Sequence, residues 1–300
     1  MFFIPIFTAI GLGLFFLIAD RVCSREVKKS YKRLEKYHHK EIELSGGNLT
    51  YAESGKGETI LSVHGITGGY DQGLDTAGHL VSGYRVISPS RFGYLGSDLP
   101  DDAGPKAQAK VFAELLDSLG IGQVCLLAAS AGGTVAIRFA LDFPERVRGM
   151  ILYSTTAPFA KKPKHWPKYA GPPASVCNNF GMFLASLFFK PIMNMCRETI
   201  YTMLPIAERR DGIINDATVT NPDMAKNFDD YPIEDIEIPV LIFQAKDDKM
   251  TKHSHIAESA RRFKNCRLVV FEKGGHLLDC CGPEIDAEER EFFAGIFPAE

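Results

Sequence analysis

The sequence lacks a large net charge, paired cysteine motifs and internal repeats. Its 300 residues hold 34 Lys and Arg against 37 Asp and Glu, a net charge of −3. The seven cysteines are an odd number without a Cys-x-x-Cys pair, and Cys280 and Cys281 are adjacent. This pattern excludes a disulfide framework or a zinc ribbon and favours free thiols in a reducing compartment.

Apolar residues are present in the proportion that fills a large core. The chain is 45% hydrophobic, 11% aromatic and 24% charged, which excludes a disordered or collagen-like protein. Residues 1–40 contain eight basic and three acidic side chains, so residues 41–300 carry an excess of eight acidic ones. An acidic body indicates that nucleic acid is not a partner.

Residues 2–19 form an uncharged run rich in Phe, Ile and Leu. Eighteen residues just reach the length of a membrane-spanning helix, so residues 1–19 are predicted to span or anchor in a membrane. A cleaved signal peptide remains an alternative, although no basic stretch precedes the run and no small-residue cleavage site follows it. Because the positive charges follow the run, the carboxy-terminal body is expected in the cytoplasm.

Residues 20–40 are predicted to form a basic juxtamembrane helix. Val27, Tyr31, Leu34 and His38 recur in it at helical spacing, which is typical of a helix lying along anionic headgroups. The alternative is a charged helix that packs on the domain. A membrane surface is therefore an expected partner.

Strand and helix patterns alternate in the body of the chain, which predicts an α/β fold with a mostly parallel sheet covered on both faces. Residues 41–44 and 49–53 are predicted to form a hairpin. Buried strands are predicted at 59–63, 84–88, 124–128, 149–153, 240–244 and 267–271, and helices at 106–119, 132–142 and 252–263.

Residues 157–238 lack a clear strand pattern and are too long for an ordinary loop. They are predicted to form an inserted helical lid between two parts of the core, 41–156 and 239–300. Residues 179–196 are rich in Phe, Leu and Met, which either pack the lid onto the core or line an apolar tunnel. The only Trp, Trp166, lies among lysines and prolines, as in a headgroup interface or a solvated loop.

Ser130 lies between a predicted strand and a predicted helix, with Ala128 and Gly132 two residues to either side. Small flanking residues permit the sharp turn that exposes a nucleophilic hydroxyl. A serine N-cap is the alternative. The following helix would also supply amide hydrogens to a developing anion at its N-terminus.

His276 follows the last predicted strand, after two glycines that let its imidazole reach back across the sheet. Asp248 follows the preceding strand, where a carboxylate can fix the tautomer of that imidazole. The adjacent Asp247 is a less favoured alternative. The order nucleophile, acid, histidine is that of alpha/beta hydrolases.

The stretch His64-Gly65-Ile66-Thr67-Gly68-Gly69 follows the strand at 59–63. A turn at Gly65 would direct the N–H of Ile66, together with that of Ala131, at a carbonyl oxygen under attack. His64 is expected to orient this loop.

These motifs together resemble the alpha/beta-hydrolase superfamily, in its lidded branch of lipases and esterases. The resemblance extends from about residue 41 to the carboxy terminus and includes the run Arg91-Phe-Gly-Tyr-Leu-Gly-Ser97. It implies an eight-stranded sheet with helices on both faces. It also implies Ser130 as nucleophile, Asp248 as acid, His276 as base, and Ile66 and Ala131 as oxyanion-hole donors. Two positions depart from the family pattern, Ala128 in place of Gly and Ser90 in place of Asp.

The expected function is that of a serine hydrolase that cleaves carboxylic esters, with lipid-like or other acyl-chain substrates favoured. No metal or organic cofactor is expected. Amide hydrolysis, carbon–carbon bond hydrolysis and perhydrolysis use the same serine framework and stay open. A non-catalytic binding protein on this fold is the alternative from another class, and it would be expected to have lost one of the three catalytic residues.

Overall fold

A single eight-stranded sheet forms the centre of the molecule in the computed structural model, which describes residues 3–297. The strand order is β1-β2-β4-β3-β5-β6-β7-β8. Strands β1 and β2 are antiparallel to their neighbours, and β3 to β8 are parallel. The strands are β1 Lys40–Leu44, β2 Gly47–Ser54, β3 Thr59–Val63, β4 Arg85–Pro89, β5 Val124–Ala129, β6 Val147–Tyr153, β7 Val240–Ala245 and β8 Cys266–Phe271. The predicted fold class is confirmed.

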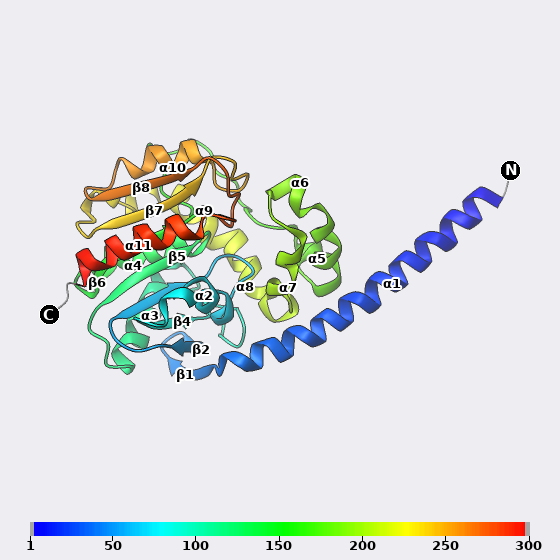
Figure 1. Cartoon of the computed structure of the whole chain (residues 1–300), viewed down its shortest axis with the longest axis horizontal. Coiled ribbons are helices and arrows are strands. Elements are labelled where there is room, and N and C mark those ends of the chain that lie inside the picture. Colours follow the sequence, from blue (N-terminus) through cyan, green and yellow to red (C-terminus); the bar gives the residue numbers. More distant parts are fainter. Residues whose placement is uncertain (1–2, 298–300) are drawn as a thin grey trace.

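The central strands are largely apolar because both faces of the sheet are covered. In β5, Leu126 belongs to the apolar cluster on one face and Leu127 to the cluster on the other. Three helices cover the first face: α3 Pro105–Ser118, α4 Gly132–Asp142 and α10 His253–Ala260. The second face is covered by α2 Tyr70–Thr76 and α11 Gly282–Ile296 (Figure 1). Buried strands of this kind follow from alternation of side chains between two cores.

The predicted lid, residues 157–238, leaves the sheet after β6 and returns at β7 without a strand of its own. Its helices are α5 Asn179–Ala185, α6 Phe189–Met193, α7 Ile200–Met203, α8 Arg210–Asn215, a π-helix Asp216–Thr220 and α9 Asn221–Lys226. Many of its buried apolar side chains, together with Cys23 and Tyr94, form one group, here called the lid cluster: Cys177, Met182, Phe183, Phe189, Met195, Ile200, Met203, Leu204, Ile206 and Ile213. Met224, Tyr231, Ile233 and Ile236, nearer its end, pack instead with the apolar cluster on the first face of the sheet. Most of the Phe and Met residues of 179–196 therefore pack the lid itself, and the predicted domain boundaries stay predictions.

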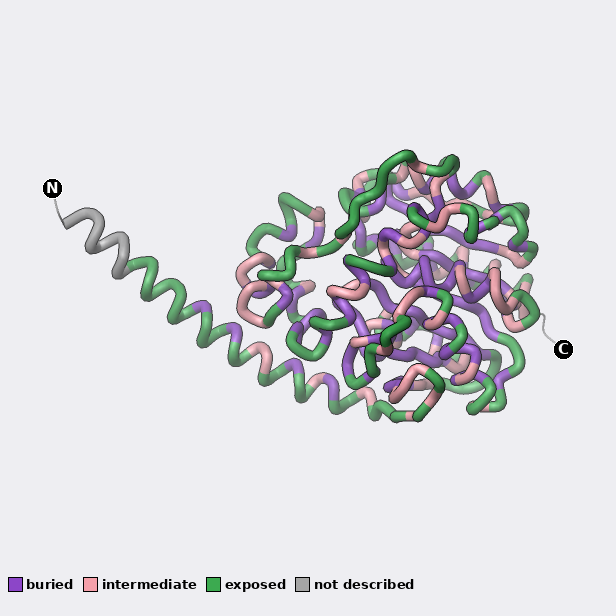
Figure 2. The backbone as a smooth tube through the Cα atoms, turned by 180° about the vertical axis from the view of Figure 1, so that it is seen from behind, coloured by how far each residue is buried: buried purple, intermediate pink, exposed green. Residues whose placement is uncertain are grey.

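The amino-terminal segment corrects the prediction of a membrane-held protein. One helix, α1 Phe3–Leu34, runs through both the predicted span and the basic stretch after it and projects beyond the body (Figures 1 and 2). Among the residues that the structure describes, no helix combines the length and apolarity needed to cross a bilayer. The apolar run is short and is diluted by Pro5, Gly11 and Gly13, and the predicted membrane localisation is contradicted. Met1 and Phe2 lie outside the described residues.

The carboxy-terminal half of α1 packs on the lid and core. Cys23 and Val27 contact the lid cluster, and Leu34 packs with Ala52 and Tyr70. The Tyr31 hydroxyl donates to Glu208 of the lid at 2.7 Å. Part of the basic stretch 20–40 thus lies in α1, where that helix packs against the domain.

Candidate active site

Ser130 occupies the sharp turn between β5 and α4. Its backbone is left-handed, with a φ of 49°, a conformation that non-glycine residues adopt only where their surroundings hold it. A Cβ on Gly132 would lie 2.4 Å from the carbonyl oxygen of Val63 and 2.6 Å from that of His64. The turn therefore requires glycine two residues after the serine.

His276 and Asp248 reach Ser130 from the loops that follow β8 and β7. The imidazole Nε2 lies 2.9 Å from Ser130 Oγ, and Nδ1 lies 2.9 Å from Asp248 Oδ2. A neutral imidazole protonated at Nδ1 donates to Asp248 and accepts the hydroxyl proton at Nε2. The structure thus brings together the three side chains that the sequence singled out.

Asp248 is held by further donors besides the imidazole. Its Oδ1 accepts the backbone N–H of Met250 at 2.7 Å, and its Oδ2 accepts the hydroxyl of Thr251 at 2.6 Å and the amide of Gln244 at 3.1 Å. Burial alone would raise the pKa of Asp248, but its contacts with His276, Thr251 and Met250 outweigh burial and lower it. The carboxylate is therefore ionised and fixed opposite His276.

Asp247, the alternative acid, points elsewhere. One of its oxygens accepts the backbone N–H of Gly275 at 2.9 Å, and the other accepts the amide of Asn194 at 2.9 Å. Asp247 therefore joins the lid to the loop that carries His276 and has no contact with the imidazole.

Ile66 and Ala131 flank Ser130 from two different segments. A Cβ on Gly65 would lie 3.1 Å from Ser130 Cβ, so the loop after β3 passes directly over the serine. Within the described residues, neither the Ile66 nor the Ala131 N–H has a protein acceptor. Buried or half-buried amide groups without a protein partner are uncommon. Their assignment as oxyanion-hole donors stays a prediction.

His64 is fully buried and orients the loop that begins with it. Its Nε2 accepts the N–H of Arg91 at 2.9 Å, and its Nδ1 lies 2.7 Å from the carbonyl oxygen of Gly65. Burial, reinforced by the Arg91 guanidinium, lowers the pKa of His64 well below its usual value. A neutral imidazole suits both contacts, because one nitrogen must accept while the other donates.

Ser90, where the sequence departs from the family pattern, is fully buried. Its Oγ accepts the N–H of Tyr70 at 3.0 Å, and its carbonyl oxygen accepts the hydroxyl of Ser97 at 3.0 Å. Ser90 therefore supports the first turn of α2 beside the His64 loop.

Sequence reasoning missed the side chains that hold the site from outside it. Gln244 and Thr251 fix Asp248, and Asn194 contacts Asp247 from the lid. Polar residues of these types are common at strand ends and in loops, so no local pattern distinguishes them. Their partners become visible only when β7, α6 and the histidine loop come together.

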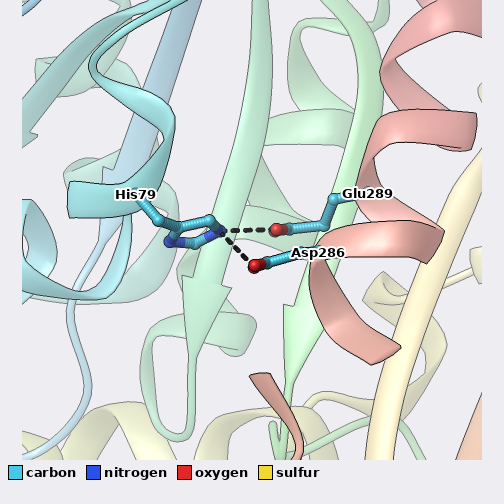
Figure 3. A group of neighbouring side chains, drawn as sticks. All are labelled: His79, Asp286 and Glu289. Carbon is cyan, nitrogen blue, oxygen red and sulfur yellow. Dashed lines mark hydrogen bonds and ion pairs between the residues drawn. The ribbon is translucent and has the colours of Figure 1, made fainter. Parts of the chain in front are cut away.

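A group of possible metal ligands, His79, Asp286 and Glu289, lies away from Ser130, between the turn at 78–80 and α11 (Figure 3). His79 Nε2 lies 2.5 Å from Glu289 Oε2 and 3.9 Å from Asp286 Oδ1. The other oxygen of Glu289, which is almost fully buried, accepts the hydroxyl of Tyr153. Both oxygens of Glu289 thus have protein partners, and the group links α11 to the sheet face beneath it.

The comparisons with known proteins identify the family. The family model described as "Alpha/beta hydrolase family" matches residues 60–287. The chain belongs to this family.

Several relatives are hydrolases by name. One is a 2-hydroxy-6-oxononadienedioate/2-hydroxy-6-oxononatrienedioate hydrolase of Burkholderia vietnamiensis, 30% identical over 75% of this chain and 83% of its own. Another, a 2-hydroxy-6-oxo-6-phenylhexa-2,4-dienoate hydrolase of Burkholderia cepacia, is 27% identical over 78% of this chain and 86% of its own. A thermophilic esterase from Thermogutta terrifontis shares the fold, with a TM-score of 0.60 and 24% identity over 86% of this chain and 98% of its own. A hydrolytic enzyme is thus supported.

Proposed function

We propose that this protein is a serine hydrolase that cleaves carboxylic esters with an apolar acyl group through an acyl-enzyme. The observation that carries the proposal is the chain of two 2.9 Å contacts from Ser130 through His276 to Asp248. It lies beside the two backbone N–H groups, of Ile66 and Ala131, that have no protein acceptor among the described residues.

Acylation begins when Ser130 Oγ attacks the ester carbonyl carbon. The hydroxyl proton passes to His276 Nε2, and the Asp248 carboxylate stabilises the imidazolium that forms. The N–H groups of Ile66 and Ala131 donate to the carbonyl oxygen as it becomes an oxyanion. The carbon–oxygen bond to the alcohol then breaks, and the alcohol leaves with the proton from Nε2.

Deacylation repeats the sequence with water. Nε2 takes a proton from water, the resulting hydroxide attacks the acyl carbon, and Ser130 Oγ leaves with the proton as the carboxylic acid is released. None of these steps calls for a metal ion or an organic cofactor.

The pairing of the nearby arginines favours a substrate with an uncharged acyl group. Arg91 and Arg209 lie behind the loop that carries Ile66, and each is already paired with a buried carboxylate, Asp216 and Asp71 respectively. The side chain of Ile66 itself packs against the lid cluster. An apolar acyl chain fits these surroundings, whereas an anionic one would find neither arginine free.

Carbon–carbon bond hydrolysis is the second candidate, because the two relatives above are named for dienoate and dienedioate substrates. Such a substrate carries its own carboxylate. The same serine, histidine and oxyanion donors serve that reaction if another cation binds the carboxylate.

Substitution of Ser130 tests the proposal. S130A should lower turnover of a chromogenic short-chain ester by at least about 10³-fold, because the nucleophile is lost, and should abolish labelling by a fluorophosphonate. The melting temperature should stay close to that of the wild-type protein, which serves as the control for folding. An ester turnover unchanged by S130A would refute the proposal.

A substrate series distinguishes the two candidates. The wild-type protein is assayed with p-nitrophenyl esters of increasing acyl length and with 2-hydroxy-6-oxo-6-phenylhexa-2,4-dienoate, whose products are identified by mass spectrometry. A higher kcat/KM for the esters supports ester hydrolysis. A higher kcat/KM for the dienoate would favour carbon–carbon hydrolysis.

A further inference from the structure

Two buried ion pairs connect the lid to the core on either side of residues 64–69. Arg91 of the core pairs with Asp216 of the lid at 2.5 Å, and Arg209 of the lid pairs with Asp71 of the core at 2.7 Å. All four side chains are at most 3% exposed. Charges buried to this degree persist only when they are paired and hydrogen-bonded.

Each of these arginines also donates to a carbonyl of the segment between them. Arg91 Nε donates to the carbonyl oxygen of His64 at 3.0 Å, and Arg209 Nη1 donates to that of Gly68 at 2.5 Å. The segment is thus fixed at its first residue by an arginine of the core and near its last by an arginine of the lid. Ile66 lies between the two points of attachment.

The backbone between those points requires such support. Thr67 has a φ of 65°, a left-handed conformation that a β-branched residue adopts at a cost. Gly68 is closely surrounded, because a Cβ there would lie 2.4 Å from Gln72 Oε1 and 2.7 Å from His64 Nδ1. A strained, tightly enclosed segment is expected to shift when one of its anchors is lost.

The amino-terminal helix adds a third cation to the same group. Arg33 Nη2 lies 2.8 Å from Asp71 Oδ2 and also donates to the lid carbonyls of Thr202 and Leu204 at 3.1 and 3.2 Å. Burial alone would raise the pKa of Asp71, but Arg209 and Arg33 outweigh it and lower the pKa to about 2. Asp71 therefore carries its charge throughout the pH range of ester hydrolysis.

We propose that Arg209 and Asp71 are positioning residues for the reaction: through them the docked lid sets the place of the Ile66 N–H, and so couples lid closure to formation of the oxyanion hole. This inference rests on the proposed function, because it assigns the Ile66 N–H to the developing oxyanion. Arg209 acts through the carbonyl of Gly68 and touches no substrate. Loss of Arg209 should therefore raise the free energy of the transition state, in which the oxyanion forms, more than it weakens substrate binding.

Arg209→Gln tests this role, because it removes both the ion pair with Asp71 and the hydrogen bond from Nη1 to the carbonyl oxygen of Gly68. We expect kcat per active site to fall by about 10- to 100-fold, of the order found when an oxyanion donor is weakened, while KM changes less than about threefold. A trifluoromethyl ketone, which forms an oxyanion on the serine, should bind more weakly by the same factor as kcat/KM falls. Active sites are counted by the end point of fluorophosphonate labelling.

Asp71→Asn is the milder second variant, because the asparagine side chain can still accept from Arg209 and leaves Arg209 beside Gly68. Its kcat should lie between those of the wild-type protein and Arg209→Gln. Arg138→Gln is the matched control. Arg138 pairs with Asp142 and donates to the carbonyl of Asp230 in the lid, as Arg209 does with Asp71 and Gly68, but contacts nothing in 64–69. Its kcat per active site should be unchanged.

Hydrogen exchange supplies a readout that does not depend on turnover. The peptide covering 64–69 should exchange faster in Arg209→Gln than in the wild-type protein or in Arg138→Gln. If this exchange is unchanged, or if kcat per titrated site stays within twofold of wild type, the inference is wrong. An inactive, unlabelled wild-type protein would instead refute the proposed function, and the exchange result would still decide whether Arg209 holds the loop.

Discussion

At the scale of single residues, two adjacent carboxylates have different tasks. Asp248 contacts the imidazole of His276, and Asp247 contacts the backbone N–H of Gly275 and the amide of Asn194. Successive side chains after a strand point in different directions, so the exact end of β7 decides which carboxylate faces the histidine. Sequence spacing favoured Asp248 but could not exclude its neighbour.

Asp248→Asn should lower kcat by about 10³- to 10⁴-fold, because an amide opposite Nδ1 no longer favours the tautomer that leaves Nε2 as base. Asp247→Asn removes a charge from the next position and serves as the matched comparison. It should lower kcat by less than about tenfold, since an amide oxygen can still accept the Gly275 N–H. Ester turnover by both variants checks this, and a reversed order would assign the acid to Asp247.

The residues of the site that could be predicted are those with a local requirement. Gly132 must lack a side chain because two carbonyl oxygens of the neighbouring segment lie where its Cβ would be, and a small residue beside a serine is visible in sequence. No local sequence pattern distinguishes Arg209 from other arginines. Arg209 lies 138 residues from Asp71 along the chain, so only the folded structure brings its guanidinium to the loop.

At the scale of elements, the strands were predictable because their side chains alternate between two apolar clusters. Ile60 and Leu61 of β3 point to opposite faces, and both are fully buried. A strand buried on both sides has a largely apolar sequence, as the predicted strands do. This accounts for the agreement between the expected and observed sheet.

Two helices, α2 and α11, were not indicated by the sequence pattern. The buried face of α11 includes Ile285 and Phe293, but the equivalent position between them is Glu289, a charged residue that interrupts the apolar stripe. Helix α2 is short and contains Gly73, which lies so close to β4 that a Cβ would meet Ser88 Oγ at 2.2 Å. Both departures from helical periodicity follow from tertiary contacts.

The contact of His79 with Glu289 makes the stability contributed by α11 depend on pH. Its hydrogen bond to Glu289 raises the pKa of His79 above its ordinary value. Since the folded protein binds this proton more tightly than the unfolded chain, the stabilisation is complete below the unfolded pKa of about 6.5 and is lost as pH rises through the raised pKa. The ion pair therefore strengthens the packing of α11 most in mildly acidic solution.

His79→Gln should therefore lower the free energy of unfolding more at pH 6 than at pH 9. Urea unfolding of the variant and the wild-type protein at the two pH values measures the difference. His165→Gln, at an exposed position of the lid, is the control for the same substitution away from Glu289. An equal loss at both pH values for His79→Gln would mean that the charge of His79 contributes nothing.

At the scale of the whole molecule, α1 contacts both the core and the lid. The hydropathy of its first half led to the incorrect prediction of a membrane anchor, whereas its second half makes specific contacts that no hydropathy profile contains. Arg33 contacts Asp71 of the core and two carbonyls of the lid, and Tyr37, directly after α1, donates to Asp75 of α2. The helix is therefore part of the scaffold that positions the lid and Asp71, which in turn contacts Arg209.

Two truncations separate the contribution of the two halves of α1. Deletion of residues 1–18 removes the exposed side chains of residues 11–18, including Leu17 and Ile18, and should leave kcat and the melting temperature close to wild type. Deletion of residues 1–38 also removes Arg33 and the buried side chain of Leu34. It should lower the free energy of unfolding by about 3 kcal/mol or more, because Asp71 loses a cation and an apolar contact surface is exposed.

The longer truncation should also lower kcat per titrated active site, since Asp71 without Arg33 would be less firmly fixed opposite Arg209. Arg33→Gln in the full-length chain isolates this effect from the loss of apolar contacts, and should reproduce the change in kcat with a smaller change in melting temperature. Ester kinetics, fluorophosphonate titration and thermal unfolding of the three variants make the comparison. If deletion of 1–38 leaves both kcat and stability unchanged, α1 has no part in holding Asp71, and the support of residues 64–69 must come from Arg91 of the core and Arg209 of the lid.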